Sequence, residues 1–128
     1  MTERRNVSSG GPWESLGGYS RAVFVGDCAW VAGTTDAGPD GQSQHPGDIA
    51  AQTRAVFEII RTALERGGFS LDDVVRTRMF LTDITRAAEV NEVHQELFDA
   101  IRPAAAMVEV SALIDPSLLI EIEVDARR

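Results

Sequence analysis

One segment of the sequence has an apolar pattern regular enough to fix its secondary structure, and the rest of the fold must be built around it. Between Ile49 and Leu64, apolar residues recur at steps of three and four, the spacing that places side chains on one face of an α-helix. Asp48 stands where an N-cap is expected, and Gly67-Gly68 supplies a stop. We therefore expect an amphipathic helix between Asp48 and Gly67.

The segments on either side of this helix have the patterns of strands and of one further helix. Gly26-Asp27 separates two apolar runs, which predicts a β-hairpin. A second helix is expected over residues 87–101, ended by Pro103, and Asp115-Pro116 is expected to turn between the last two strands. The segments expected to form strands are 22–25, 28–32, 74–81, 107–110 and 119–124.

These elements define an α+β domain of order β-β-α-β-α-β-β, with two helices packed on one face of a mixed sheet. Residues 1–18 contain four glycines, Pro12 and several serines, so we expect an irregular lead-in before a single domain over residues 19–128. Residues 22–25 and 119–124 are apolar on both faces, and two helices would cover only one face. This pattern favours self-association through the other face.

Composition argues against several kinds of chemistry. All twelve cationic residues are arginine, so no lysine can form a Schiff base with a substrate or with pyridoxal phosphate. The formal net charge of −8 opposes nucleic acid as a partner. One cysteine, Cys28, and two histidines cannot supply a zinc motif, and neither phosphate-binding glycine motif occurs. We expect no metal, no cofactor and no membrane span, and a cytoplasmic protein with an inert Cys28 thiol.

Charged residues on two strands are the first candidates for a site. Glu121 and Glu123 are two apart on a strand, so they share a face that meets either water or a binding site. Arg76 and Arg78 share a face in the same way, and either a cross-strand ion pair or capture of a substrate carboxylate would explain them. His94 could act as a base, but a histidine at the boundary of the helix, satisfied by a neighbour, is the preferred interpretation.

Several segments taken together resemble the RidA/YjgF family. No single segment is specific, but they occur in the family's order from about Tyr19 to Ala126, nearly the whole chain. The matching segments are 18–23, 26–27, 32–33, 52–53, 67–75, 80–84, 90–91, 103–104, 108–110 and 120–123.

This resemblance implies a chorismate-mutase-like (YjgF) fold assembled as a homotrimer, with a small-molecule cleft at each subunit interface. Enzymes of the family hydrolyse reactive enamines and imines to 2-keto acids and ammonia without a cofactor. By resemblance, the catalytic glutamate falls on Glu121 and a pocket tyrosine on Tyr19. Gly33, Asn91 and Met107 fall on other positions around the cleft.

One departure from the family pattern bears directly on function. The family's arginine, which grips the substrate carboxylate, falls on Ala105. A methyl group cannot replace that charged, forked contact, which contributes about 1.5–3 kcal/mol or more to binding. Arg102, Arg21 and Arg78 are the candidates for the vacant role, and Arg78 is included among the expected substrate-binding residues.

Two functions follow as hypotheses. The first is a cofactor-free imine or enamine hydrolase of non-standard specificity, with Glu121 as general acid/base. The second is a non-catalytic, ligand-binding or regulatory trimer of the same family. RNA cleavage, a role attached to some relatives, is disfavoured by the net charge of −8.

Overall fold

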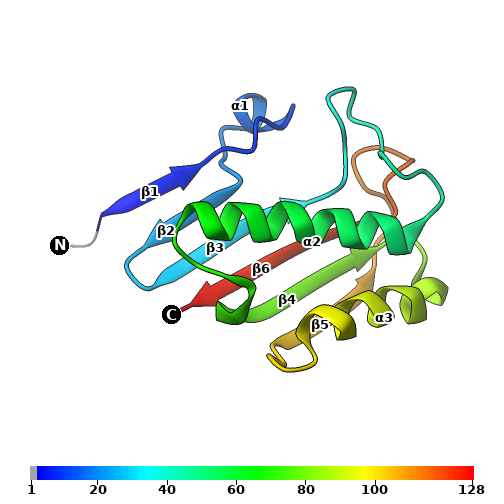
Figure 1. Cartoon of the computed structure of the whole chain (residues 1–128). Coiled ribbons are helices and arrows are strands. Elements are labelled where there is room, and N and C mark those ends of the chain that lie inside the picture. Colours follow the sequence, from blue (N-terminus) through cyan, green and yellow to red (C-terminus); the bar gives the residue numbers. More distant parts are fainter. Residues whose placement is uncertain (1–2) are drawn as a thin grey trace.

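A single six-stranded mixed sheet organises the computed structural model, which describes residues 3–128 (Figure 1). The strands lie in the order β1-β2-β3-β6-β4-β5, and every neighbouring pair is antiparallel except β4 and β5, which are parallel. The strands are β1 (Arg4–Val7), β2 (Ala22–Val25), β3 (Cys28–Thr34), β4 (Val74–Leu81), β5 (Ala104–Glu109) and β6 (Ile120–Arg127). The helices are α1 (Glu14–Gly17), α2 (Ile49–Arg66) and α3 (Ala87–Phe98), with 3-10 turns at η1 (Leu71–Asp73) and η2 (Ile84–Arg86).

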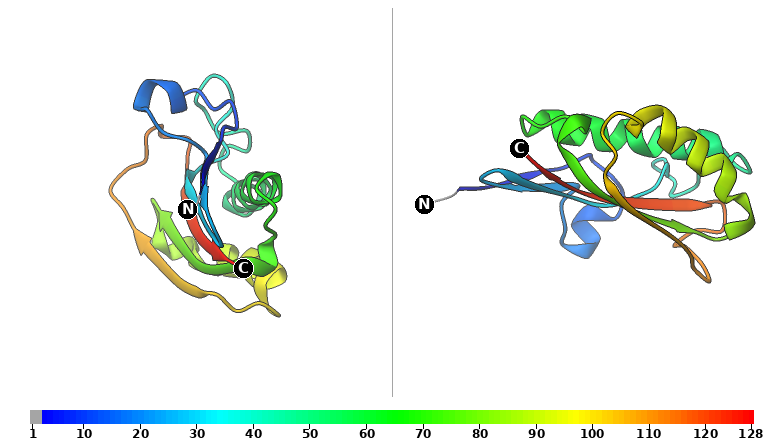
Figure 2. Two further views of the ribbon diagram at one scale, coloured as in Figure 1. Left: turned by 90° about the vertical axis from the view of Figure 1, so that its left-hand side faces the viewer. Right: turned by 90° about the horizontal axis from the view of Figure 1, so that it is seen from below.

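Helix α2 forms as its pattern predicts and supplies much of the core. The side chain of Asp48 accepts a hydrogen bond from the Ala51 backbone N–H at 3.0 Å, which caps the helix. Its apolar stripe, which includes Val56, Phe57 and Ile60, is fully buried. Figure 2 shows α2 and α3 on one face of the sheet, whereas α1 lies on the opposite side. The α+β fold with two long helices on one face is thus confirmed.

The prediction of an irregular segment over residues 1–18 is wrong for residues 3–18, and residues 1 and 2 lie outside the part of the chain that the structure describes. Residues Arg4–Val7 form strand β1, which pairs with β2, and Glu14–Gly17 form the short helix α1. β1 escapes a pattern-based prediction because it is an edge strand with mostly exposed side chains, held by backbone hydrogen bonds and not by an apolar face. The other expected elements are present in the expected order.

The last two strands differ from expectation in bounds and placement. β5 begins three residues earlier than expected, at Ala104, and β6 continues to Arg127. β6 lies between β3 and β4, while β5 lies beyond β4 at the edge, so Asp115-Pro116 belongs to a connection that passes around β4. Helix α3 ends at Phe98, before the expected residue 101.

The face of the sheet away from α2 and α3 carries both charged and apolar side chains. β6 alternates strictly, so Ile122 and Val124 are buried while Glu121 and Glu123 point to this open face. Trp30 on β3 and Val108 on β5 also lie on it, 46% and 45% exposed. Apolar groups of this size left in water are a common property of a surface that another protein covers.

Candidate functional site

A cavity of about 770 Å³ opens where the N-terminal segment crosses the end of β3. Residues 9–13 and α1 form one wall, and residues 33–39 form another. Glu121 of β6 and Arg21 line it as well, and in the described part of the chain they are its two charged lining residues. The remaining lining is rich in apolar groups, among them Trp13 and Ile59.

Glu121 enters this cavity because a glycine, Gly33, lies against its carboxylate on the neighbouring strand. The pairing of β3 with β6 shifts register between Val31 and Thr34, and Gly33 lies in that irregularity. A Cβ atom at Gly33 would lie 2.1 Å from Oε2 of Glu121, far inside contact distance. Glycine therefore leaves the space that the carboxylate occupies.

The surroundings of Glu121 favour its protonated form. Burial raises the pKa of the carboxyl above its ordinary value of 4.5, and the charge of Glu123 adds to that rise. The guanidinium of Arg21 acts in the opposite direction but does not cancel the effect of burial. A carboxyl with a raised pKa can give up and retake a proton closer to neutral pH than an exposed one.

Arg21 lies beside Glu121 but is held by the protein itself. Its Nη1 donates to the carbonyl oxygen of Gly33 at 2.7 Å and to Oγ1 of Thr34 at 2.8 Å. Its Nε is buried without a hydrogen bond, 3.9 Å from Oε2 of Glu14. The guanidinium also lies over the ring of Tyr19, 5.7 Å from the ring centre. Arg21 thus fixes the wall of the cavity.

The structure divides the residues expected in the site into two groups. Tyr19, Gly33 and Glu121 meet at the cavity, together with Arg21. Asn91 is exposed on α3, and Met107 and Ala105 lie on β5 in register with Met79 and Thr77. Within the single chain these three residues do not line the cavity.

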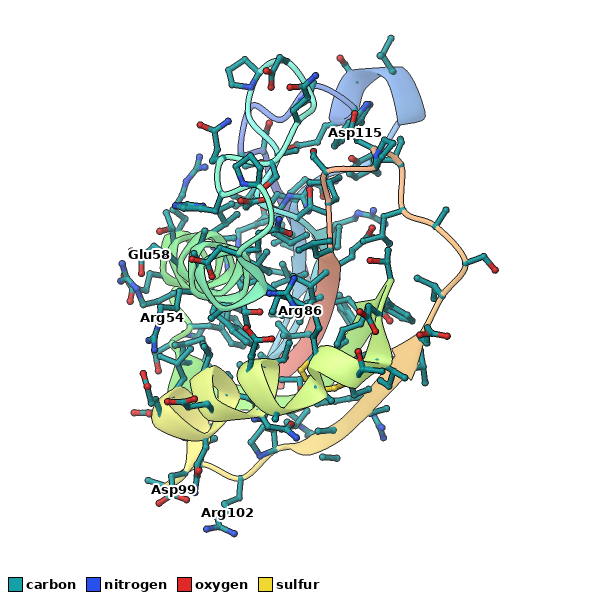
Figure 3. All side chains as sticks on the ribbon, turned by 90° about the vertical axis from the view of Figure 1, so that its right-hand side faces the viewer. Arg54, Glu58, Arg86, Asp99, Arg102 and Asp115 are labelled. Carbon is teal, nitrogen blue, oxygen red and sulfur yellow. The ribbon has the colours of Figure 1, made fainter. Side chains whose placement is uncertain are left out.

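The other arginines considered for the clamp are engaged elsewhere. Nη1 of Arg78 lies 3.5 Å from Oε1 of Glu123 and 3.3 Å from Oδ2 of Asp125, so the cross-strand ion pair is confirmed for Arg78. Arg102 pairs with Asp99 at 2.9 Å, and Figure 3 shows it at the opposite end of the molecule from α1. Of the three candidates, Arg21 is the one that lines the cavity.

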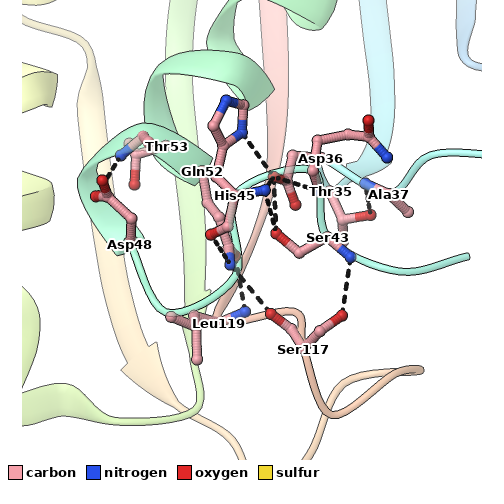
Figure 4. Close-up of polar contacts among 12 residues, drawn as sticks. Thr35, Asp36, Ala37, Ser43, His45, Asp48, Gln52, Thr53, Ser117 and Leu119 are labelled. Atoms are coloured by element: carbon pink, nitrogen blue, oxygen red, sulfur yellow. Dashed lines mark hydrogen bonds and ion pairs between the residues drawn. The ribbon is translucent and has the colours of Figure 1, made fainter.

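Sequence reasoning missed the buried carboxylate of Asp36, which anchors one wall of the cavity (Figure 4). Oδ2 of Asp36 accepts hydrogen bonds from Oγ of Ser43 at 2.9 Å and from two backbone N–H groups, those of residues 44 and 45, at 3.1 Å. Nδ1 of the His45 ring lies 3.1 Å from the same oxygen. These contacts tie residues 36–45 into one loop. A polar loop sequence shows no sign of them, because they depend on the path of the backbone.

A second buried polar residue joins this loop to the sheet. Gln52 of α2 donates to the carbonyl oxygens of His45 at 3.1 Å and Ser117 at 3.0 Å, and accepts from the backbone N–H of Leu119 at 2.9 Å (Figure 4). Its side chain is fully buried and its hydrogen bonds connect three segments distant in sequence.

His94 has the structural role preferred for it. Its Nε2 lies 2.9 Å from Oγ1 of Thr77, and its ring packs against Phe57 and Phe98. Burial lowers the pKa of the imidazole, so the neutral form is favoured.

Within residues 3–128, no group of three or more side chains that could hold a metal ion occurs. Of the helices in the described residues, none is both long and apolar enough to cross a membrane.

Solved structures share this architecture. Rv2704 from Mycobacterium tuberculosis, a member of the YjgF/YER057c/UK114 family, superimposes with a TM-score of 0.89 at 52% identity, covering 98% of this chain and all of that one. The YjgF gene product of Escherichia coli has a TM-score of 0.80 at 30% identity, covering 96% of this chain and 94% of its own. Fold and cavity therefore define a class of protein, the small α+β proteins with the YjgF fold.

Sequence comparison gives the family. A family model described as Endoribonuclease L-PSP matches residues 12–128. A RutC family protein of Pyrococcus abyssi is 42% identical over 108 residues, which is 84% of each chain. The chain belongs to the Endoribonuclease L-PSP family, also called RidA/YjgF, and the resemblance noted in the sequence is confirmed.

Proposed function

We propose that this protein is a cofactor-free hydrolase that converts imines or enamines of small molecules into carbonyl compounds and ammonia. One observation carries the proposal: the carboxyl of Glu121, with its pKa raised by burial, opens into a cavity of about 770 Å³. The cavity has room for a small organic substrate and a water molecule. Proton transfer to and from water is chemistry that one such carboxyl can perform without a cofactor.

The proposed reaction uses Glu121 first as an acid and then as a base. The protonated carboxyl donates to the imine nitrogen, and this makes the imine carbon more electrophilic. Water attacks that carbon, a C–O bond forms, and the carboxylate accepts the proton that the water loses. The reprotonated carboxyl then donates to the amine nitrogen of the carbinolamine, the C–N bond breaks to release ammonia, and the hydroxyl proton returns to the carboxylate as the carbonyl forms. The sum is one imine and one water converted to one carbonyl compound and one ammonia.

We further propose that the protein acts as a cytoplasmic homotrimer with each cavity at a subunit interface. Leu16 and Ile114 line the cavity and are 84% and 65% exposed in the single chain, which leaves an apolar rim for a neighbouring subunit to cover. Asn91, Ala105 and Met107, which lie away from the cavity of their own chain, would then belong to the neighbour's side of the cleft.

The test is ammonia release from freshly generated imines with wild-type protein and two matched variants. Glu121→Gln keeps the shape of the side chain but cannot exchange a proton, so we expect the catalysed rate to fall by about 100-fold or more. Glu123→Gln is the control, because Glu123 lies on the same strand and face but pairs with Arg78. If neither 2-imino acids nor carboxylate-free imines are hydrolysed faster with the wild-type protein, the proposal is wrong.

A non-catalytic role in ligand binding or regulation is the second candidate, and Ala105 favours it because the family's carboxylate-binding arginine is absent there. In that case Glu121→Gln would leave the protein's biological effect unchanged. RNA cleavage is the activity in the family model's description, but the net charge of −8 argues against it.

A further inference from the structure

The two charged residues in the described lining of the cavity, Arg21 and Glu121, are poorly suited to bind a carboxylate. A carboxylate is gripped best by two parallel N–H groups of one guanidinium. The cavity contains a single guanidinium, that of Arg21, among its described lining residues. In the proposed trimer a neighbouring subunit would add Asn91, Ala105 and Met107, none of which is charged, so Arg21 is the guanidinium to consider.

Both forked edges of Arg21 are blocked. One edge needs Nη1, which already donates to the carbonyl of Gly33 and to Oγ1 of Thr34. The other edge needs Nε, which is sealed from solvent and faces the carboxylate of Glu14 at 3.9 Å. The guanidinium is therefore a fixed part of the wall and not a clamp for an incoming anion.

The remaining charged group in the cavity attracts cations. When Glu121 is ionised, a carboxylate substrate would lie beside its negative charge, and the guanidinium of Arg21 has no free pair of N–H groups to bind that substrate. Trp13 and Tyr19 add aromatic rings to the same cavity, and such rings stabilise cations and apolar groups. Leu16, Ile59 and Ile114 extend the apolar lining.

We propose that the cavity selects imines that lack a carboxylate, in particular cationic iminium ions bearing an apolar or aromatic substituent, and that amines of the same shape bind as ligands. The proposal rests on the hydrolase function above and narrows its substrate class. In the reaction, an iminium ion and water give a carbonyl compound and ammonium, so Glu121 need only accept and return the proton of the attacking water.

The test compares ligands of one shape and different charge. Benzylamine, benzyl alcohol and benzoate are titrated into the full-length protein at neutral pH by calorimetry or ligand-observed NMR. We expect benzylamine to bind more tightly than benzoate by about tenfold or more, the gain expected from one charge-assisted hydrogen bond. Glu121→Gln should remove the preference for benzylamine, whereas Glu123→Gln should keep it. Benzoate binding as tightly as benzylamine, or a preference that survives Glu121→Gln, would overturn the proposal.

A turnover measurement separates this inference from the function on which it rests. The imines of phenylethylamine and of phenylalanine are generated in place by an amine oxidase and an amino-acid oxidase, and differ by one carboxylate. We expect the carboxylate-free imine to be hydrolysed with the higher kcat/KM. Faster hydrolysis of the phenylalanine imine would refute the substrate class but support the hydrolase. Hydrolysis of neither imine, with the amine preference intact, would refute the hydrolase and leave the ligand class standing.

Discussion

At the scale of single residues, the site depends on the space that Gly33, which has no side chain, leaves for the carboxylate of Glu121. The missing Cβ is what allows the carboxylate to lie against β3, because the added atom would be 2.1 Å from Oε2. The alternation of the strand alone does not distinguish Glu121 from Glu123, and the two differ in the structure for this reason. The first occupies the space over Gly33, and the second pairs with Arg78.

The substitution Gly33→Ala should displace the carboxylate of Glu121 and reduce the rate of imine hydrolysis by about tenfold or more, the size of effect expected from a small misplacement of a reacting group. The measurement is kcat/KM for ammonia release. A shorter carboxylate should fit beside the new methyl group, so Gly33→Ala combined with Glu121→Asp should recover part of the loss. No change in rate on Gly33→Ala would show that the position of Glu121 does not matter.

Glu121 should also carry a cost in stability that depends on pH. Because burial raises its pKa in the folded protein above 4.5, ionisation favours the unfolded state. The cost is absent below the unfolded pKa and grows as pH rises through the interval up to the folded pKa. We therefore expect Glu121→Gln to raise the Tm at neutral pH, with a gain that fades as the pH falls toward 4.5.

The measurement is thermal unfolding of both proteins across that pH range. Glu123→Gln should show a much smaller gain, because it removes only the minor repulsion that acts on Glu121 and gives up a partly exposed ion pair with Arg78. A Glu121→Gln variant less stable than wild type at neutral pH would contradict the assignment of burial as the main cause.

At the scale of elements, the loop between β3 and α2 is built around one carboxylate. Asp36 is 3% exposed and its Oδ2 receives two backbone N–H groups and the hydroxyl of Ser43. The same loop supplies Thr35, Ala37 and Gly38 to the cavity wall. The shape of the cavity therefore depends on the order of this loop.

Replacing Asp36 by alanine should lower the free energy of unfolding by about 3 kcal/mol, because several donors lose their acceptor at once. Denaturant unfolding measures the loss. Asp40→Ala is the control in the same loop, since Asp40 is exposed and accepts only from the backbone N–H of Gln42 in the hydrogen bonds described. A loss no larger than that of Asp40→Ala would mean that Asp36 does not organise the loop.

The sequence predicts these elements unequally, for physical reasons. Helix α2 is predictable because its buried face requires apolar residues at steps of three and four from Ile49 to Leu64, and this spacing is visible in the sequence. Strand β1 is not, because its residues Arg4–Val7 are held through their backbone and any polar sequence could form the same bonds. Local pattern also cannot say that β6 inserts between β3 and β4, since pairing partners are chosen by the whole fold.

Part of the candidate site was predictable from the sequence, and part was not. Glu121, Tyr19 and Gly33 were found from family resemblance, and the structure brings all three to one cavity. The partners of Arg21 and the network around Asp36 were not predictable, because they are contacts between segments whose approach leaves no local pattern.

At the scale of the whole molecule, the open face of the sheet is the surface for the proposed trimer. We expect Trp30→Asp to prevent self-association, because a charge placed on a face that another subunit covers would lose its water. Trp30 is 46% exposed in the single chain, so the monomer should still fold. Sedimentation velocity measures the mass, and circular dichroism checks the fold. Thr62→Asp, on the exposed side of α2, is the control that should leave the mass unchanged. A wild-type protein that sediments as a monomer would refute the trimer.

The two edges of the sheet have different consequences for solubility. β1 ends the sheet with the exposed, charged side chains of Arg4 and Arg5, which discourage another strand from docking there. β5 ends it with three exposed alanines, at 104–106, and the exposed Val108, so its unpaired backbone groups have little to protect them. A chain kept monomeric by mutation should therefore aggregate through β5, and a single lysine placed in that strand should keep it in solution.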